Sequence, residues 1–437
     1  MRTKLIKGFS KLSLEEKRYF ISLFCKDPGN AEKMMDDFLF RDSEQRKHFL
    51  ELTENTISSF HLPYGIVPNI VVDGKIYHVP MAVEESSVVA AASHSARYWS
   101  ERGGFKVKEL QTEKPGHVYL RWYSEPSQLY SHWESLKVFL LERLKKVTAS
   151  MVHRGGGILR LDLLDETHLL NHLYKVELVV DTVNSMGANF VNTCLEDIAE
   201  GIELFFKTEQ RIPADKFQVV MAILSNNTDK CTVSIEASCN LNDLNLISEG
   251  LPAEVFADKM AFAYRIAAVD PSRAATHNKG IMNGVDAALI ATGNDFRAAE
   301  AASHAFASRD GSYRSLSSCS YKSDIFTIGI TLPLAVGTVG GITNLHPMAK
   351  LSLDILGNPT AKELMGVVAA VGLATNFAAV RSLVTTGIQK GHMRLHLSNI
   401  LNSLNVPPEK RKEAESFFRK KKVSFNAVKH FLDEKKH

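Results

Sequence analysis

Residues 111–225 carry the pattern that most restricts the fold of this chain. An extended stretch, GHVYLRWY, precedes a long helical pattern from Ser127 to Met151, and two more extended stretches follow, GILRLDLL and LYKVELVVDTV. A second helical stretch, ANFVNTCLEDIAEGIELFFKT, leads to a last strand, FQVVMAIL. The order strand, helix, strand, strand, helix, strand is that of a ferredoxin-like βαββαβ unit. The sequence therefore predicts such a domain here, inserted between two parts of a larger one.

The segment before the insert mixes helical and extended patterns. Residues 14–52 are predicted to be helical, with a capping pattern that begins at Ser13. Asp73-Gly74 lies between two apolar runs and predicts a β-hairpin. A helix is expected from about Ser86.

The segment after the insert is predicted to be largely helical. Beyond residue 250, alanine and other small residues recur at helical spacing, and the part from about 388 is strongly basic. Such a charge run is typical of a solvated helix face. We therefore expect an α+β fold in which a large, mainly helical domain surrounds the insert.

Length and charge limit the class of protein. A chain of 437 residues exceeds the size of one hydrophobic core, so two or three domains are expected. A net charge of +3 argues against a broad nucleic-acid surface. Five cysteines without CxxC spacing indicate a reducing cytoplasm, with no disulfide framework and no structural zinc. The most apolar run, at 365–380, is too short to span a membrane.

Two acidic residues, Glu84 and Glu85, precede the expected helix in MAVEESSVVAAAS. Carboxylates at this place complement the helix macrodipole, which is a sufficient structural explanation. A role as general acid requires burial or a second carboxyl that holds the proton at neutral pH. Both interpretations stay open at this point.

A single lysine, Lys279, opens the run KGIMNGVDAALIATGND. Asp295 lies 16 positions later, which on one unbroken helix means about 24 Å of rise and about 160° of rotation. Gly293-Asn294 supplies a break that lets Asp295 fold back towards the same cleft. An ammonium in such a cleft stabilises an oxyanion; a structural salt bridge is the alternative.

Two further stretches contain candidate functional groups. His392 and His396 lie on one helical face in GHMRLH, but the glutamate of an HExxH motif is missing, so a single catalytic histidine is preferred to a metal site. In DTVNSMGANFVNT, Gly187 admits close backbone approach at a helix N-terminus, which suits a phosphate group. The chain has no GxGxxG motif, so a dinucleotide would not be held as in a Rossmann fold.

Several long stretches, in the same order, resemble class II 3-hydroxy-3-methylglutaryl-CoA (HMG-CoA) reductase, the soluble bacterial and archaeal form. The similarity runs from about residue 50 to residue 400. It rests on ENTISSFHLPYGI, EESSVVAAAS, SMGANFVNT, DPSRAATHNKGIMNGVDAALIATGNDFRAAEA, LPLAVGTVGG and QKGHM. The resemblance implies a large substrate and CoA domain at 1–110 and 226–387, a nicotinamide-cofactor domain at 111–225, and a helical C-terminal flap at 388–437.

The resemblance implies a catalytic set composed of Glu85, Lys279, Asp295 and His392. Lys279 would stabilise the oxygen anion of the hemithioacetal intermediate, and Asp295 would hold that lysine. His392 would protonate the departing CoA thiolate, and Glu85 would donate a proton to the aldehyde oxygen. Position within the same signatures implies substrate-side roles for Ser87, Arg273 and Asn283.

Members of this family reduce the thioester by two hydride transfers, which yields mevalonate and CoA. The resemblance places the cofactor at Arg160, Asn184, Ser185, Met186, Gly187 and Asn189. In NADH-using relatives an aspartate occupies the place that counting from the glycines of GGGILRLDL assigns to Arg160. An arginine pairs well with a 2′-phosphate, so we expect NADPH, with NADH as the alternative. The other interpretation is that Arg160 points to solvent from an alternating strand.

The resemblance also implies a homodimer whose active sites take groups from both subunits, with a higher oligomer left open; the composition indicates a cytoplasmic protein. The expected partners are HMG-CoA, mevalonate and CoA, and no metal, nucleic acid or membrane. Two alternatives stay open: the same enzyme run oxidatively on mevalonate, and a non-catalytic paralogue that binds CoA esters.

Overall fold

The computed structural model describes residues 6–434 apart from 211, 214, 386, 388–396, 398–399, 419–420 and 422. The chain divides into two compact units, Met1–Pro63 and Tyr64–His437. The second unit contains the elements that concern the candidate site.

The first unit contains a 3₁₀ turn at Phe9–Lys11 and three short helices, α1 (Leu14–Ser22), α2 (Pro28–Asp37) and α3 (Ser43–Glu51). The predicted cap is confirmed, because Glu16 N donates to Ser13 Oγ while Ser13 N donates to the Glu16 carboxylate. The prediction of continuous helix over 14–52 is wrong. Asp27 and Asp42 each cap a new helix, and such N-caps start helices rather than continue them.

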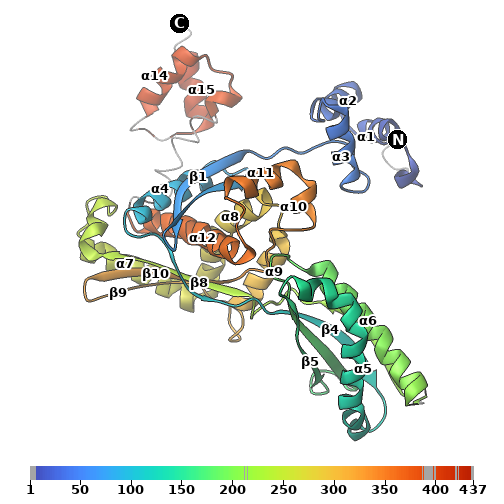
Figure 1. The fold of residues 1–437 in the computed structure, drawn as a ribbon. Helices are drawn as coiled ribbons and strands as arrows, with labels where there is room; N and C mark the ends of the chain where they lie inside the picture. Colours follow the sequence, from blue (N-terminus) through green and yellow to red (C-terminus); the bar gives the residue numbers. More distant parts are fainter. Residues whose placement is uncertain are drawn as a thin grey trace. The chain divides into compact units, whose positions relative to one another are not determined.

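The insert has the predicted order of elements. These are β4 (Lys114–Trp122), α5 (Pro126–His153), β5 (Gly157–Asp165), β6 (Leu173–Asp181), α6 (Ala188–Leu204), a π-helical turn (Phe205–Glu209) and β7 (Phe217–Leu224). The strands form an antiparallel sheet in the order β5-β6-β4-β7, which is the ferredoxin-like arrangement. Helices α5 and α6 pack together on one face of this sheet (Figure 1). Trp122, Leu140, Val176, Leu195 and Phe206 belong to the core between them.

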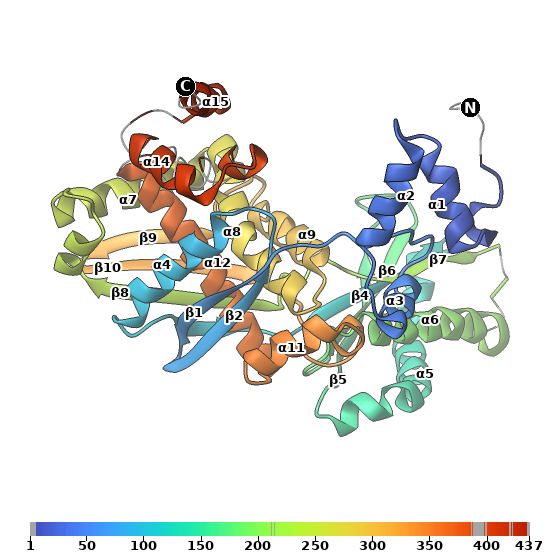
Figure 2. The ribbon, with the colours of Figure 1, turned by 90° about the horizontal axis from the view of Figure 1, so that it is seen from above.

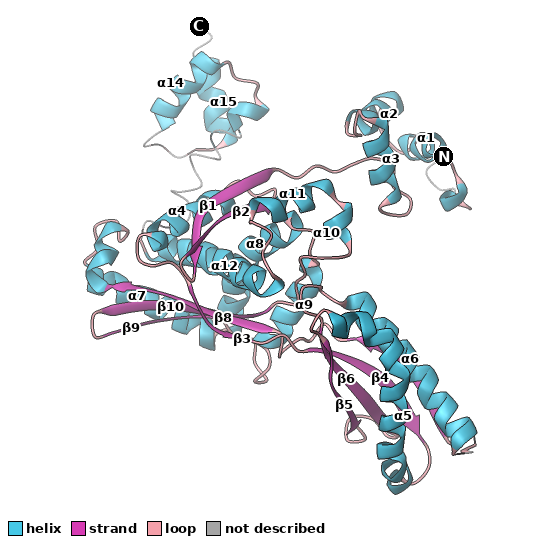
Figure 3. Ribbon diagram, in the orientation of Figure 1, coloured by secondary structure: helices cyan, strands magenta, loops and turns pink. Residues whose placement is uncertain are grey.

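The flanking segments contribute a hairpin, a second sheet and several helices. The hairpin joins β1 (Tyr64–Val72) to β2 (Lys75–Ala82) through Asp73 and Gly74, whose φ angles of 48° and 82° suit a tight hairpin turn. The second sheet has the order β3-β8-β10-β9 and is separate from the first (Figure 3). Its strands are β3 (Lys106–Leu110), β8 (Thr232–Asn240), β9 (Ser317–Lys322) and β10 (Ile325–Pro333). This sheet was not predicted.

The helices of this part are α4 (Val88–Ser100), α7 (Ala253–Val269), α8 (Pro271–Ala291), α9 (Phe296–Ala307), α10 (Ile342–Leu345), α11 (Pro347–Ile355) and α12 (Ala361–Val384), with a 3₁₀ segment at Leu241–Leu246. α12 packs against α4, α7 and α8 and against β8 and β10 (Figure 2). By length and composition α12 is apolar enough to cross a membrane, but 72% of its most apolar window is buried inside the protein. α12 is therefore explained as a core helix.

Two C-terminal helices, α14 (Pro408–Phe418) and α15 (Phe425–Glu434), have a small core of their own. Leu401, Ala414, Phe418 and Val428 belong to that core. The predicted division of the chain at 110, 225 and 387 stays a prediction. Strands β4 to β7, at 114–224, lie within the predicted insert.

Candidate active site

The loop that joins β6 to α6 contains the predicted phosphate-binding stretch. Gly187 has a φ of 92°, and a Cβ at this position would approach Thr182 Cγ2 to 2.4 Å, so a side chain is excluded here. The buried Lys114 donates from Nζ to Thr182 Oγ1 and, at 2.9 Å, to the carbonyl oxygen of Ser185. Desolvation lowers the pKa of Lys114 from its ordinary value. The buried Lys114 side chain therefore holds this loop through two hydrogen bonds.

Asn184 connects the loop to the helix α12. Its side-chain Oδ1 accepts from Ala361 N at 2.9 Å, and its backbone oxygen accepts from Thr338 N at 2.8 Å. Since Ala361 is the first residue of α12, the side chain satisfies one of the free N–H groups at that helix end. Asn184 thus joins the insert to the rest of the second unit.

The loop borders a cleft of about 720 Å³. Five of the predicted site residues line it: Ser185, Met186, Gly187, Asn189 and Asp295. Gly340 and Gly341 line it as well, and a Cβ on either glycine would meet no atom within 4 Å. The volume is in the range of small-molecule and cofactor sites, so these residues fit a nicotinamide dinucleotide.

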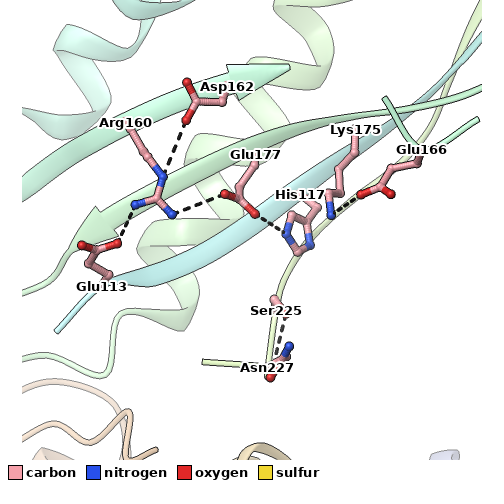
Figure 4. A network of polar contacts seen from close by, with 9 residues as sticks. All are labelled: Glu113, His117, Arg160, Asp162, Glu166, Lys175, Glu177, Ser225 and Asn227. Carbon is pink, nitrogen blue, oxygen red and sulfur yellow. Dashed lines mark hydrogen bonds and ion pairs between the residues drawn. The ribbon is translucent and has the colours of Figure 1, made fainter. Parts of the chain in front are cut away.

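Arg160 lies outside this cleft, in a network on the open face of the β4–β7 sheet (Figure 4). Its Nη1 is 2.5 Å from Glu113, its Nη2 is 3.4 Å from Glu177, and its Nε is 3.6 Å from Asp162. Hydrogen bonding to Glu113 is the main cause of a raised pKa of Arg160. Three carboxylates therefore compensate the guanidinium charge before any ligand arrives.

The neighbouring groups of this network are also paired. Glu177 lies 3.3 Å from His117, and Lys175 lies 2.8 Å from Glu166 (Figure 4). Burial is the main cause of a lowered pKa of His117. The network is thus rich in ion pairs.

Lys279 and Glu85, two of the predicted catalytic residues, form an ion pair. Lys279 lies in the middle of α8, and its Nζ donates to Glu85 Oε2 at 3.2 Å. Ser87 Oγ, at the start of α4, donates to the other carboxylate oxygen at 3.3 Å. The Lys279 side chain is 65% exposed and that of Glu85 39%, so a substrate can reach both. The predicted Arg273 and Asn283 lie on the same helix.

Asp295, which was expected to contact Lys279, contacts Ala298 and Arg297 instead. α8 ends before Gly293, whose φ is 69°, and the predicted break in the helix is confirmed. Asp295 caps α9 by accepting from Ala298 N at 3.1 Å, and it lies 3.4 Å from Arg297 Nε. In the described part of the chain no hydrogen bond or ion pair joins Asp295 to Lys279. The predicted His392 lies outside the described residues.

Two charged residues of the cleft were not predicted. Arg154 and Arg297 both line it. Arg154 could have been found from the sequence, because it directly precedes three glycines at 155–157. A helix is expected to end before such a run, so the side chain at its end lies beside a glycine turn. Arg297 follows the predicted Asp295 by two positions. Among the described residues no group of three or more His, Cys, Asp or Glu is placed to hold a metal ion.

Comparisons with known proteins agree with this fold. The family model of hydroxymethylglutaryl-coenzyme A reductase matches residues 14–397. The 3-hydroxy-3-methylglutaryl-coenzyme A reductase of Archaeoglobus fulgidus is 39% identical over 397 residues, which are 90% of this chain and 86% of that protein. A probable reductase of the same name from Borreliella burgdorferi is 34% identical, over 92% of this chain and 88% of that protein.

Solved structures of the class II enzyme from Streptococcus pneumoniae are also similar. One, described as bound to NADPH in open conformations, has a TM-score of 0.71 at 36% identity and covers 87% of this chain and 99% of that one. A second structure has a TM-score of 0.71 at 35% identity and covers 98% of this chain and 99% of that one. The matched family and these relatives are oxidoreductases. This chain belongs to the hydroxymethylglutaryl-coenzyme A reductase family.

Proposed function

We propose that this chain reduces HMG-CoA to mevalonate and CoA with two equivalents of NADPH. The observation that carries the proposal is the pair of Lys279 and Glu85, which meet across 194 positions of sequence at an exposed site. A cation and a carboxyl group held together can stabilise charge on a substrate oxygen and transfer a proton to it. The resemblance assigns these two tasks to these two residues.

Lys279 directs its ammonium at the carbonyl oxygen of the thioester as that oxygen gains negative charge. Ser87 holds the carboxyl group of Glu85 by its hydrogen bond, so that a proton can pass to the aldehyde oxygen in the second reduction. Arg273 and Asn283 contact the substrate from the same helix. His392 protonates the CoA thiolate.

The cleft beside the β6–α6 loop is proposed as the seat of NADPH, which supplies hydride when bound. Its fit rests on the volume of about 720 Å³ and on the residues Ser185, Met186, Gly187 and Asn189 along its wall. The backbone N–H groups at the start of α6 suit a phosphate. Further support is that the Streptococcus pneumoniae structure is described as bound to NADPH. Asn184 would act indirectly, by holding the loop.

We also propose a homodimer with shared active sites, in the cytoplasm. Lys279 contacts Glu85 of its own chain, whereas Asp295 faces the cofactor cleft. A second chain that brings its Asp295 to this Lys279 would complete the catalytic set. Five unpaired cysteines suit a reducing compartment.

Substitution of Lys279 tests the proposed function. Lys279→Met should lower kcat for NADPH oxidation with HMG-CoA by roughly a hundredfold or more, because the developing oxygen charge loses its cation. The melting temperature should change little, since an exposed ion pair contributes at most about 1 kcal/mol. The readouts are NADPH consumption and CoA release.

Lys207→Met is the matched control, because Lys207 forms a comparably exposed pair with Glu203 at 2.7 Å. Its kcat should equal that of the wild type. If the wild-type protein consumes no cofactor with HMG-CoA, and none forms from mevalonate and CoA, the non-catalytic alternative takes the place of this proposal.

A further inference from the structure

Two arginines line the cofactor cleft, and they differ in their partners. Arg297 lies 3.4 Å from the carboxylate of Asp295, so its charge is already compensated. Among the described residues no carboxylate is paired with Arg154. The cleft therefore contains one guanidinium whose charge is available to a ligand.

Arg154 is the exposed C-cap residue of α5. Its Nε donates to the carbonyl oxygen of Ser150 at 3.2 Å, which leaves both terminal nitrogens as donors. The next residue, Gly155, has a φ of 88°, and a Cβ there would meet no atom within 4 Å. Arg154 lines the cleft of about 720 Å³, which has room for a phosphate group.

Arg160 is the other candidate for an anion, and its surroundings are unfavourable. Arg160 lines a pocket of about 260 Å³ that is separate from the cleft, and two of its three carboxylate contacts, Glu113 and Glu177, line the same pocket (Figure 4). An anion that reached Arg160 would displace at least one of these carboxylates and would face the repulsion of the others. This cost in free energy opposes the binding of an anion at Arg160.

We propose that Arg154, and not Arg160, binds the 2′-phosphate of NADPH and so sets the preference over NADH. The inference rests on the proposed function of the cleft. A guanidinium donates two parallel hydrogen bonds to a phosphate, and this geometry is lost with a neutral side chain. The competing explanation is that Arg154 only complements the C-terminal end of the α5 macrodipole through Ser150.

Direct binding separates these explanations without any turnover. Calorimetry with adenosine 2′,5′-bisphosphate and with 5′-AMP as probes measures the contribution of the 2′-phosphate alone. In Arg154→Gln the affinity for the bisphosphate should fall roughly tenfold or more relative to the affinity for 5′-AMP, as expected for loss of charge-assisted hydrogen bonds. Arg160→Gln should change that ratio much less.

Arg309→Gln is the matched control. Arg309 follows α9 and donates to the carbonyl oxygen of Phe306 at 2.7 Å, so it is also an exposed arginine at a helix C-terminus, but it does not line the cleft. It should leave the ratio unchanged. If Arg154→Gln lowers only the melting temperature and keeps the ratio, Arg154 is a helix-end residue and the proposal is overturned.

The kcat/KM ratio for NADPH over NADH with HMG-CoA should fall by the same factor in Arg154→Gln. A larger fall in Arg160→Gln than in Arg154→Gln would also overturn the proposal. Failure of the proposed function has a different signature: the wild type would oxidise neither cofactor, while the calorimetric ratio would still report on Arg154.

Discussion

His277 lies two positions before Lys279 on α8 but faces the protein interior. Its Nε2 is 2.6 Å from Ser317 Oγ on β9 and 3.1 Å from Asn376 Nδ2 on α12. Burial, and then the positive charge of Arg273, lower the pKa of His277 to about 3. Positions two apart on a helix differ by about 200° of rotation, so the buried His277 and the exposed Lys279 lie on opposite faces of α8.

This burial predicts a pH dependence of stability. Because the folded-state pKa lies below the ordinary 6.5, the unfolded chain binds more protons between about pH 3 and 6.5. The free energy of unfolding should therefore fall as the pH is lowered, by roughly 1–2 kcal/mol from this group between pH 6.5 and 5.

Urea unfolding of the wild type and of His277→Asn at both pH values, at one protein concentration, isolates this contribution. The variant should be less stable at pH 6.5 by roughly 1–3 kcal/mol, since buried polar groups lose a partner. It should also lose less stability on acidification. Equal pH dependence in the two proteins would show that His277 is not the group that titrates.

At the scale of elements, the conformation of the β6–α6 loop depends on Lys114, which lies at the start of β4 and donates hydrogen bonds to Thr182 and Ser185. Without the Lys114 amine, the Thr182 hydroxyl and the Ser185 carbonyl lose a donor and the loop can relax. Lys114→Met should therefore raise KM for NADPH several-fold and change KM for HMG-CoA less. Steady-state kinetics with each substrate varied in turn provides the measurement.

Lys175→Met is the control for this prediction, because Lys175 is a mostly buried lysine of the same sheet that is paired with Glu166 outside the cleft. It should leave KM for NADPH unchanged. Similar effects of both substitutions would mean that loss of domain stability, and not the loop, is responsible.

The elements themselves were predictable where a regular pattern extends over a whole strand or helix. The insert followed from alternation and helical periodicity, and the hairpin from Asp73-Gly74. β8 was missed although CTVSIEASCN alternates, with Val233, Ile235 and Ala237 buried. The order of the second sheet was beyond prediction, because β3 pairs with β8 across more than one hundred positions, and local sequence does not encode such pairings.

The site was predictable only through resemblance. Lys279 and Glu85 are 194 positions apart, and no spacing rule brings them together. Counting along the strand gave Arg160 as the partner of the 2′-phosphate, but counting cannot reveal that three carboxylates surround it. Its role stays a prediction, to be compared with Arg154.

At the scale of the whole molecule, Glu85 and Lys279 of one chain form an ion pair, whereas Asp295 of that chain caps α9 and does not contact Lys279 in the part of the chain that the structure describes. If two chains share each site, inactive Lys279→Met and Asp295→Asn chains should complement each other, because one site of the mixed dimer then has all its groups. Asparagine is also a good N-cap, so α9 should persist. Equal mixing should restore roughly a quarter of the wild-type rate, given random pairing in a two-fold dimer.

The same assay tests both the reductase activity and the placement of its catalytic groups. A mixture of Glu85→Gln and Lys279→Met chains is the control, since both groups belong to the same half of the site and no mixed dimer contains an intact one. The measurement is NADPH oxidation with HMG-CoA after subunit exchange has been verified. Recovery in the first mixture and none in the control is the predicted result; no recovery in either, or equal recovery in both, would contradict the shared site.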